Sequence, residues 1–147
     1  MANLNSFYAT WTPRVLSILR IGAGFLLIAH GAQKLFGFLA PPGMPSFPPF
    51  SQMWVGGVLE FFGGLLLLLG LFTRPVAFIL SGLMAFAYFI GHGLDGSFWP
   101  ILNKGELAAL YSFVFLYLAV AGGGAWSLDL LLRRDGPSRL AGTYGRR

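Results

Sequence analysis

The sequence predicts an all-α membrane protein, a polytopic four-helix bundle, from two observations. The 147 residues are 56% hydrophobic and only 10% charged, whereas a soluble domain carries about a quarter charged residues. Four apolar segments lie at residues 15–39, 54–73, 75–94 and 107–128, and each reaches the ~20 residues with which a helix crosses a ~30 Å hydrocarbon core. They show no polar–apolar alternation and are longer than barrel strands of about 9–11 residues, which favours helices.

These four segments account for most of the chain, so we expect one transmembrane domain over residues 1–134. Residues 135–147 contain three glycines and one proline and predict a flexible basic tail.

The arginines predict the orientation of the helices. Arg14 precedes the first span, Arg74 lies between the second and third, and five of the ten basic residues follow the fourth. The opposite side carries only Lys34 and Lys104, so the positive-inside rule places both termini in the cytoplasm. The net charge of +5 is explained by basic residues that set the orientation of the helices or contact anionic lipid. We therefore expect no nucleic-acid partner.

A carboxylate, Glu60, stands inside the apolar second segment, in the stretch GGVLEFFGG. At about 100° per residue, the glycines at 56, 57, 63 and 64 all lie within about 60° of it on the helix. Small residues let helices approach closely in a membrane, so this face is expected to contact another helix.

Three further polar residues are expected beside Glu60 in the outer half of the membrane. His30 and His92 lie toward the outer ends of the first and third spans, and Lys34 follows His30 by one helical turn. His30, Lys34, Glu60 and His92 are therefore the candidate ligand-binding residues. Ionisable groups in a membrane mark functional sites by default, although pairing that only joins helices is the alternative interpretation.

A second pair is expected in the inner half. Arg20 lies about 8 Å above the start of the first span, and Asp129 approaches from the inner surface at the end of the fourth. We interpret this pair as a structural ion pair.

Several chemistries can be assigned to the outer cluster. Two histidines and a carboxylate match the ligand types of an iron site, but no His-x-x-x-His or Glu-x-x-His spacing occurs and Lys34 would repel a cation, so we expect no metal. Two histidines from different helices can also ligate a b-type haem. A hydrogen-bonding pocket for a quinone headgroup is the most economical interpretation, because histidine or lysine donates to a carbonyl and a histidine–glutamate pair relays protons. The chain has no cysteine, which excludes chemistry through its own thiols.

The segments RIGAGFLLIAHGAQKLFG, GGVLEFFGGLLLLLGLFTRP, FIGHG and GGGAWSLD together resemble the DoxX family of small four-helix bacterial inner-membrane proteins. The resemblance covers about residues 20 to 129 and implies a multi-pass protein of the bacterial inner membrane. Some relatives are linked to membrane redox chemistry, including a subunit of a thiosulfate:quinone oxidoreductase and partners of antioxidant or sulfur-transfer enzymes.

We therefore expect an accessory redox-associated membrane subunit that binds a quinone-like lipid, with a redox enzyme or a second copy as partner. No catalytic residue is assigned, and whether the chain forms part of an enzyme is left open. The first alternative is a non-catalytic scaffold or anchor for a partner protein. The second, a small-solute transporter, has less support because no inverted repeat is evident.

Overall fold

The structure, a computed structural model, describes residues 2–93 and 97–134, and these residues form helices and loops without a strand. The helices are α1 (Ala2–Phe36), α2 (Gln52–Leu69), α3 (Thr73–Phe86), the π-helix η1 (Ala87–His92), α4 (Pro100–Asn103), α5 (Glu106–Ala121) and α6 (Leu128–Arg134). The predicted all-α class is confirmed for this part of the chain. The expected tail at residues 135–147 lies outside the described residues.

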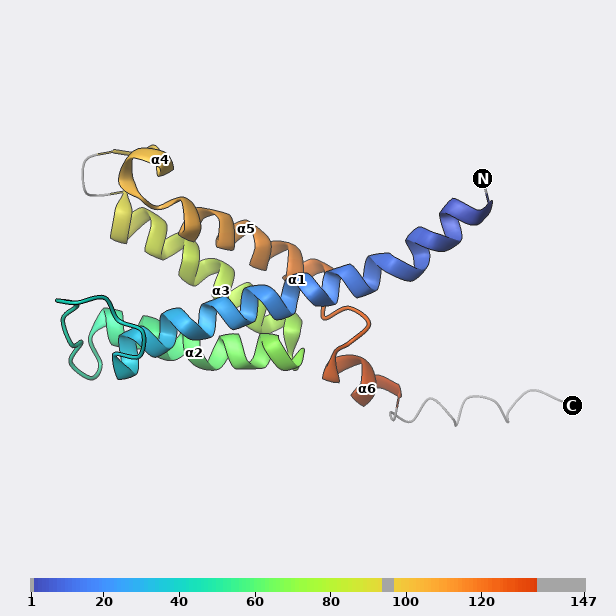
Figure 1. The fold of residues 1–147 in the computed structure, drawn as a ribbon, viewed down its shortest axis with the longest axis horizontal. Helices are drawn as coiled ribbons and strands as arrows, with labels where there is room; N and C mark the ends of the chain where they lie inside the picture. Colours follow the sequence, from blue (N-terminus) through green and yellow to red (C-terminus); the bar gives the residue numbers. More distant parts are fainter. Residues whose placement is uncertain (1, 94–96, 135–147) are drawn as a thin grey trace, which may run out of the picture.

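The helices pack as two pairs, α1 along α2 and α3 along α5, with a smaller contact between α2 and α3 (Figure 1). The connection between α1 and α2 and the short helix α4 lie at one end of the bundle, which we call the α4 end. Helix α6 lies at the opposite end, the α6 end, and α1 projects past the other helices there (Figure 1).

Three helical stretches are long and apolar enough to cross a membrane, at Leu4–Phe36, Gln52–Leu69 and Thr73–His92. Helix α1 begins well before the expected residue 15, and its 35 residues extend about 52 Å at 1.5 Å per residue. Helix α5 is shorter than the apolar segment 107–128, because it ends at Ala121 before three consecutive glycines. Its 16 residues extend only about 24 Å.

Glycines with a positive φ end two of these helices. Gly70 follows α2 with φ 68°, and the amide of Leu71 donates to the carbonyl of Leu66, as in a Schellman motif. Gly122 follows α5 with φ 88°. Both turns lie at the α6 end, where they bring the segment 122–127 beside the α2–α3 turn.

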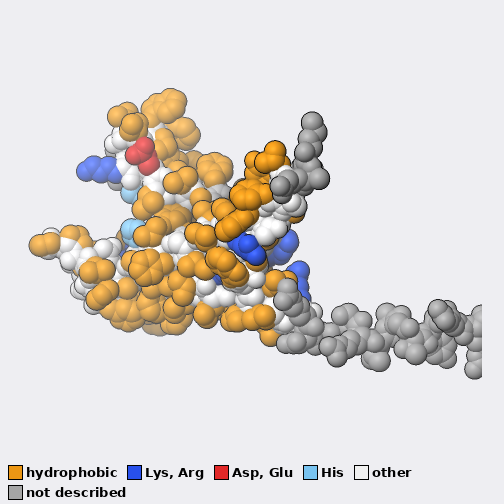
Figure 2. Space-filling view, turned by 45° about the vertical axis from the view of Figure 1, so that its right-hand side comes forward, with side chains coloured by type: hydrophobic (Ala, Val, Ile, Leu, Met, Phe, Trp, Pro, Cys, Tyr) orange, Lys and Arg blue, Asp and Glu red, His pale blue; other side chains and the backbone are white. Residues whose placement is uncertain are grey.

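The surface between the two ends of the bundle is hydrophobic, and charged side chains gather at the ends (Figure 2). Large apolar side chains such as Phe25, Phe78 and Phe113 are exposed on it, whereas soluble monomers seldom expose apolar patches of more than a few hundred Å². The buried core is smaller and is centred on Leu27, Leu67, Leu80, Phe115 and Leu118. This distribution is that of a membrane protein, whose outer surface contacts lipid.

Candidate functional site: a polar cavity between the helices

A cavity of about 280 Å³ at the α4 end is lined by all four residues expected to cluster, His30, Lys34, Glu60 and His92. We call it the α4-end cavity. The remaining lining residues are Leu27, Met84, Ala87, Lys104, Leu107, Ala108 and Tyr111. The structure therefore brings the four residues together, while their role in binding a ligand stays a prediction.

Glu60 and Lys34 form an ion pair across the α1–α2 contact. The Nζ atom of Lys34 lies 2.6 Å from Oε1 of Glu60, and the side chains are 20% and 6% exposed. The second carboxylate oxygen of Glu60, Oε2, is buried and has no hydrogen-bond partner among the residues described. A buried acceptor without a partner is costly, so Oε2 is a point at which a ligand hydroxyl or a water would be stabilised.

Four glycines at a spacing of seven residues bring α1 and α2 close enough for this pair to form. A Cβ atom built on Gly24 would lie 2.9 Å from the carbonyl oxygen of Gly64, and one built on Gly31 would lie 2.8 Å from that of Gly57. In each case the obstacle is backbone, which cannot rotate away. Gly56 differs, since a Cβ there would meet nothing within 4 Å. The close approach expected from GGVLEFFGG thus depends on some of its glycines and not on others.

His92 is placed by a π-helix, a rare element that often occurs at functional sites. Its Nδ1 atom lies 3.1 Å from the carbonyl oxygen of Asn103 in the loop before α5. A carbonyl can only accept, so Nδ1 carries the proton and donates, which leaves Nε2 of the neutral ring as an acceptor. The side chain of Asn103 in turn donates to the carbonyl of Ser97 and accepts from the amide of Gly105. The loop therefore fixes both the position and the tautomer of His92.

Lys104 and Tyr111 also line the cavity but were not among the expected site residues. Tyr111 lies on the buried stripe of α5 with Ala108, Phe115 and Leu118, and a polar side chain on such a stripe is the signal that could have indicated it. Lys104 follows α4 in the left-handed conformation, with φ 60°. No sequence pattern places that loop over the cavity.

Lys34 and Lys104 carry positive charge at the cavity and Glu60 carries negative charge, so the lining has a formal charge of +1 when the histidines are neutral. Over residues 2–93 and 97–134 no three His, Asp or Glu side chains are close enough together to hold a metal ion. The arrangement therefore offers hydrogen-bond donors and acceptors within an otherwise apolar lining, as ligand pockets commonly do.

At the α6 end, Arg20 and Asp129 do not form the direct ion pair that we expected. Arg20 is fully buried, and its guanidinium group donates to backbone carbonyls. Its Nε atom lies 2.8 Å from the oxygen of Gly123, Nη1 donates to Leu67 and, at 2.8 Å, to Leu68, and Nη2 donates to Trp126. The carbonyls of Leu67 and Leu68 are at the C-terminus of α2, where the helix dipole favours a cation; that of Leu67 also accepts from the amide of Gly70.

Asp129 instead satisfies the N-terminus of α3. Its two carboxylate oxygens accept from the amide of Phe72 at 2.7 Å and from that of Thr73 at 2.8 Å. Asp129 attracts Arg20 electrostatically. In the described part of the chain, however, Arg20 and Asp129 are not within ion-pair distance of each other. The helix ends offer both charges better-placed backbone partners than each other, because the C-terminus of α2 presents carbonyls to Arg20 and the N-terminus of α3 presents amides to Asp129.

The fold and its cavity define a small helical membrane protein with a polar site among its spans. A profile of the DoxX family matches residues 15–93. An uncharacterized protein of Haemophilus influenzae is 45% identical over 122 residues, which are 81% of this chain and 91% of that one. The protein called "Inner membrane protein YphA" of Escherichia coli is 30% identical over 131 residues, 80% of this chain and 89% of that one. No solved structure matches. The chain belongs to the DoxX family, as its sequence resemblance indicated.

Proposed function

We propose that the protein is a redox-associated subunit of the bacterial inner membrane that binds a quinone-like lipid headgroup in the α4-end cavity. The observation that carries the proposal is the convergence of Lys34, Glu60 and both histidines on one cavity between apolar helices. An apolar cavity of about 150 Å³ holds benzene, so the volume of about 280 Å³ suits a substituted ring.

The lining residues divide into donors and acceptors that suit such a headgroup. Lys34 and Lys104 are donors that can bind the carbonyl oxygens of the oxidised form. The acceptors Glu60 Oε2 and His92 Nε2 suit the hydroxyl groups of the reduced form and can take their protons. A quinone supplies two-electron redox chemistry, and in this proposal a partner protein exchanges the electrons, because the chain has no cysteine of its own.

The orientation follows the charges at the two ends. Arg14, Arg74 and Arg133 lie at the α6 end, and Arg134, Arg139, Arg146 and Arg147 follow them in the sequence, whereas the basic residues at the α4 end are Lys34 and Lys104. Positive-inside asymmetry supports a cytoplasmic α6 end, with both termini inside, and the α4-end cavity in the outer half of the membrane. The name of the Escherichia coli relative supports an inner-membrane location.

The alternative function is a non-catalytic scaffold for a partner protein. It is favoured by the Lys34–Glu60 pair itself, since an ion pair at membrane depth can simply join two helices. It is also favoured by α1, which carries exposed Phe7, Tyr8 and Trp11 where it projects past the bundle.

The experiment that separates the two is purification in nanodiscs, followed by lipid extraction and identification of bound quinone and of co-purifying proteins. The quinone proposal expects bound quinone in the wild type and its loss in Glu60→Gln. Glu106→Gln is the matched control, because Glu106 is exposed and is not a lining residue of the cavity. A stable partner, no quinone and an indifferent Glu60→Gln variant would favour the scaffold.

A further inference from the structure

A second and larger cavity, of about 560 Å³, opens at the α6 end. We call it the α6-end cavity. Its wall is formed by the turn that begins α3, by the glycine segment 122–124 and by α6. Its polar and charged lining side chains are Thr73, Arg74, Ser127, Asp129 and Arg133. Nothing in the proposed quinone site uses this cavity, which lies at the other end of the spans.

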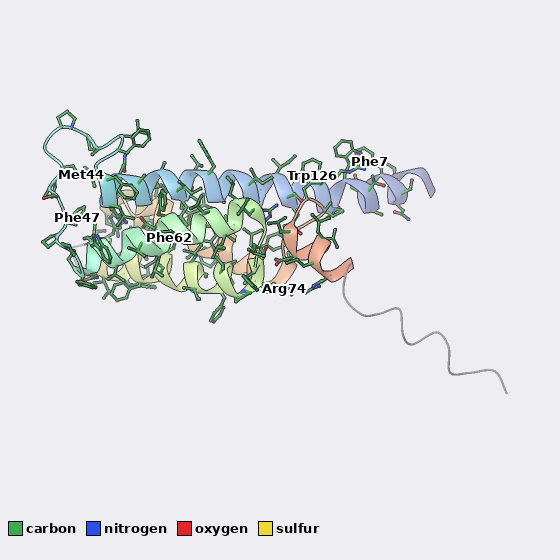
Figure 3. All side chains as sticks on the ribbon, turned by 90° about the horizontal axis from the view of Figure 1, so that it is seen from below. Phe7, Met44, Phe47, Phe62, Arg74 and Trp126 are labelled. Atoms are coloured by element: carbon green, nitrogen blue, oxygen red, sulfur yellow. The ribbon has the colours of Figure 1, made fainter. Side chains whose placement is uncertain are left out.

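Two arginines at this cavity have no carboxylate partner in the described part of the chain. Arg74 and Arg133 are both exposed, and the ion pair that the described residues form, Lys34–Glu60, lies at the opposite end. A Cβ atom on Gly122 would lie 3.4 Å from Nε of Arg74, so the guanidinium lies beside the glycine segment. Figure 3 shows Arg74 beside α6 at this end of the bundle.

Asp129 offsets only part of this positive charge. It is the carboxylate of the cavity lining, and it also interacts electrostatically with the buried Arg20. Two arginines and one aspartate give the lining a formal charge of +1.

A separate observation indicates a missing polar partner. Thr73 is fully buried at the cavity wall, and its hydroxyl has no hydrogen-bond partner among the described residues. An unsatisfied buried hydroxyl in a native protein calls for an explanation such as a bound ion, ligand or water. It is also a donor, as are the two guanidinium groups, so the free groups around this cavity favour an acceptor with negative charge.

The cavity lies beside the turn between α2, which ends at Leu69, and α3, which begins at Thr73, so it is at the end of two helices that are long and apolar enough to cross a membrane. Arginine binds phosphate through paired, charge-assisted hydrogen bonds. We propose that the α6-end cavity binds a phosphate group, carried by a phospholipid headgroup or free in solution, between Arg74 and Arg133. The site is independent of the quinone proposal.

The test uses the full chain, purified in neutral detergent and freed of bound lipid. Short-chain phosphatidylglycerol, a diacylglycerol of the same chain length and inorganic phosphate are titrated separately, with native mass spectrometry for the lipids and calorimetry for phosphate. We expect phosphatidylglycerol to bind at least tenfold more tightly than diacylglycerol. Arg74→Gln and Arg133→Gln should each weaken it about tenfold, or about 1.4 kcal/mol, because each removes charge-assisted hydrogen bonds to the phosphate.

Arg14→Gln is the control, since Arg14 is basic and at the same end but stacks on Trp11 outside the cavity. Unchanged binding in Arg14→Gln with loss in the two other variants supports the site. If inorganic phosphate binds with the same dependence on Arg74 and Arg133, the site also takes the free anion. If inorganic phosphate does not bind, the phosphate group is that of a phospholipid. Equal binding of phosphatidylglycerol and diacylglycerol, or equal losses in all three variants, would overturn the proposal. Should either glutamine variant fail to fold, Arg74→Lys and Arg133→Lys keep the charge but lose the paired donors, and undiminished binding in both would also overturn it.

Discussion

Lys34 Nζ lies 2.6 Å from Glu60 Oε1, joining α1 to α2 beside the α4-end cavity. Removal of one partner leaves the other charge without compensation in an apolar setting. We therefore expect Lys34→Met to lower the free energy of unfolding by roughly 2–4 kcal/mol, since breaking a buried pair is strongly destabilising. The double variant Lys34→Met/Glu60→Gln should recover much of that loss. Unfolding by titration with a denaturing detergent gives the free energy of unfolding of Lys34→Met, Glu60→Gln and the double variant. If the losses of the two single variants add up to that of the double variant, the pair does not interact.

The glycine spacing that brings α1 and α2 together predicts a sharp difference between two alanine variants. Gly31→Ala places a Cβ 2.5 Å from the backbone nitrogen of Phe61, and overpacking of this kind costs about 1–3 kcal/mol. Gly56→Ala meets nothing within 4 Å and should be neutral or stabilising by up to about 1 kcal/mol, because alanine favours a helix. Thermal unfolding in the same detergent compares them. Equal stability of the two variants would contradict the close helix contact.

Arg20 predicts a strict requirement for a guanidinium group at the α6 end. Arg20→Lys keeps the charge but cannot reach carbonyls of α2 and of the 122–127 segment with the same set of donors. We expect a loss of roughly 2–4 kcal/mol, as for other buried charged hydrogen-bond networks. Asp129→Asn should cost less, about 1–2 kcal/mol, because the amide oxygen still accepts one of the two α3 amides. A lysine variant as stable as the wild type would show that charge alone suffices.

Helical periodicity was enough to place part of this architecture. Apolar runs marked the helices, and a depth count along each span placed His30, Lys34, Glu60 and His92 near one level. Helical periodicity could not predict the hydrogen-bond partners of Arg20, because these partners are backbone carbonyls and every residue carries one. The π-helix that positions His92 has no residue pattern of its own, and Lys104 reaches the cavity through a left-handed loop residue. The sequence could thus predict the depth of a side chain along its span. Contacts made by the backbone and by loops could be identified only in the structure.

His92 should be protonated on Nδ1 when its ring is neutral, because that atom donates to the carbonyl of Asn103. Nitrogen-15 chemical shifts of histidine-labelled protein in nanodiscs distinguish the two tautomers, and His92→Gln identifies the signal. A neutral ring protonated on Nε2 would contradict the assignment of Nε2 as a proton acceptor for a ligand.

The most direct measurement of the central claim is photoaffinity labelling by a quinone analogue, with the labelled peptides mapped by mass spectrometry. Ala108 lines the α4-end cavity and is nearly fully buried, so Ala108→Phe fills the space while every polar residue stays in place. We predict labelling on α1, η1 or α5 at that end, competed by unlabelled quinone and lost in Ala108→Phe. Labelling that is confined to other surfaces, or that persists in Ala108→Phe, would contradict a quinone site in this cavity.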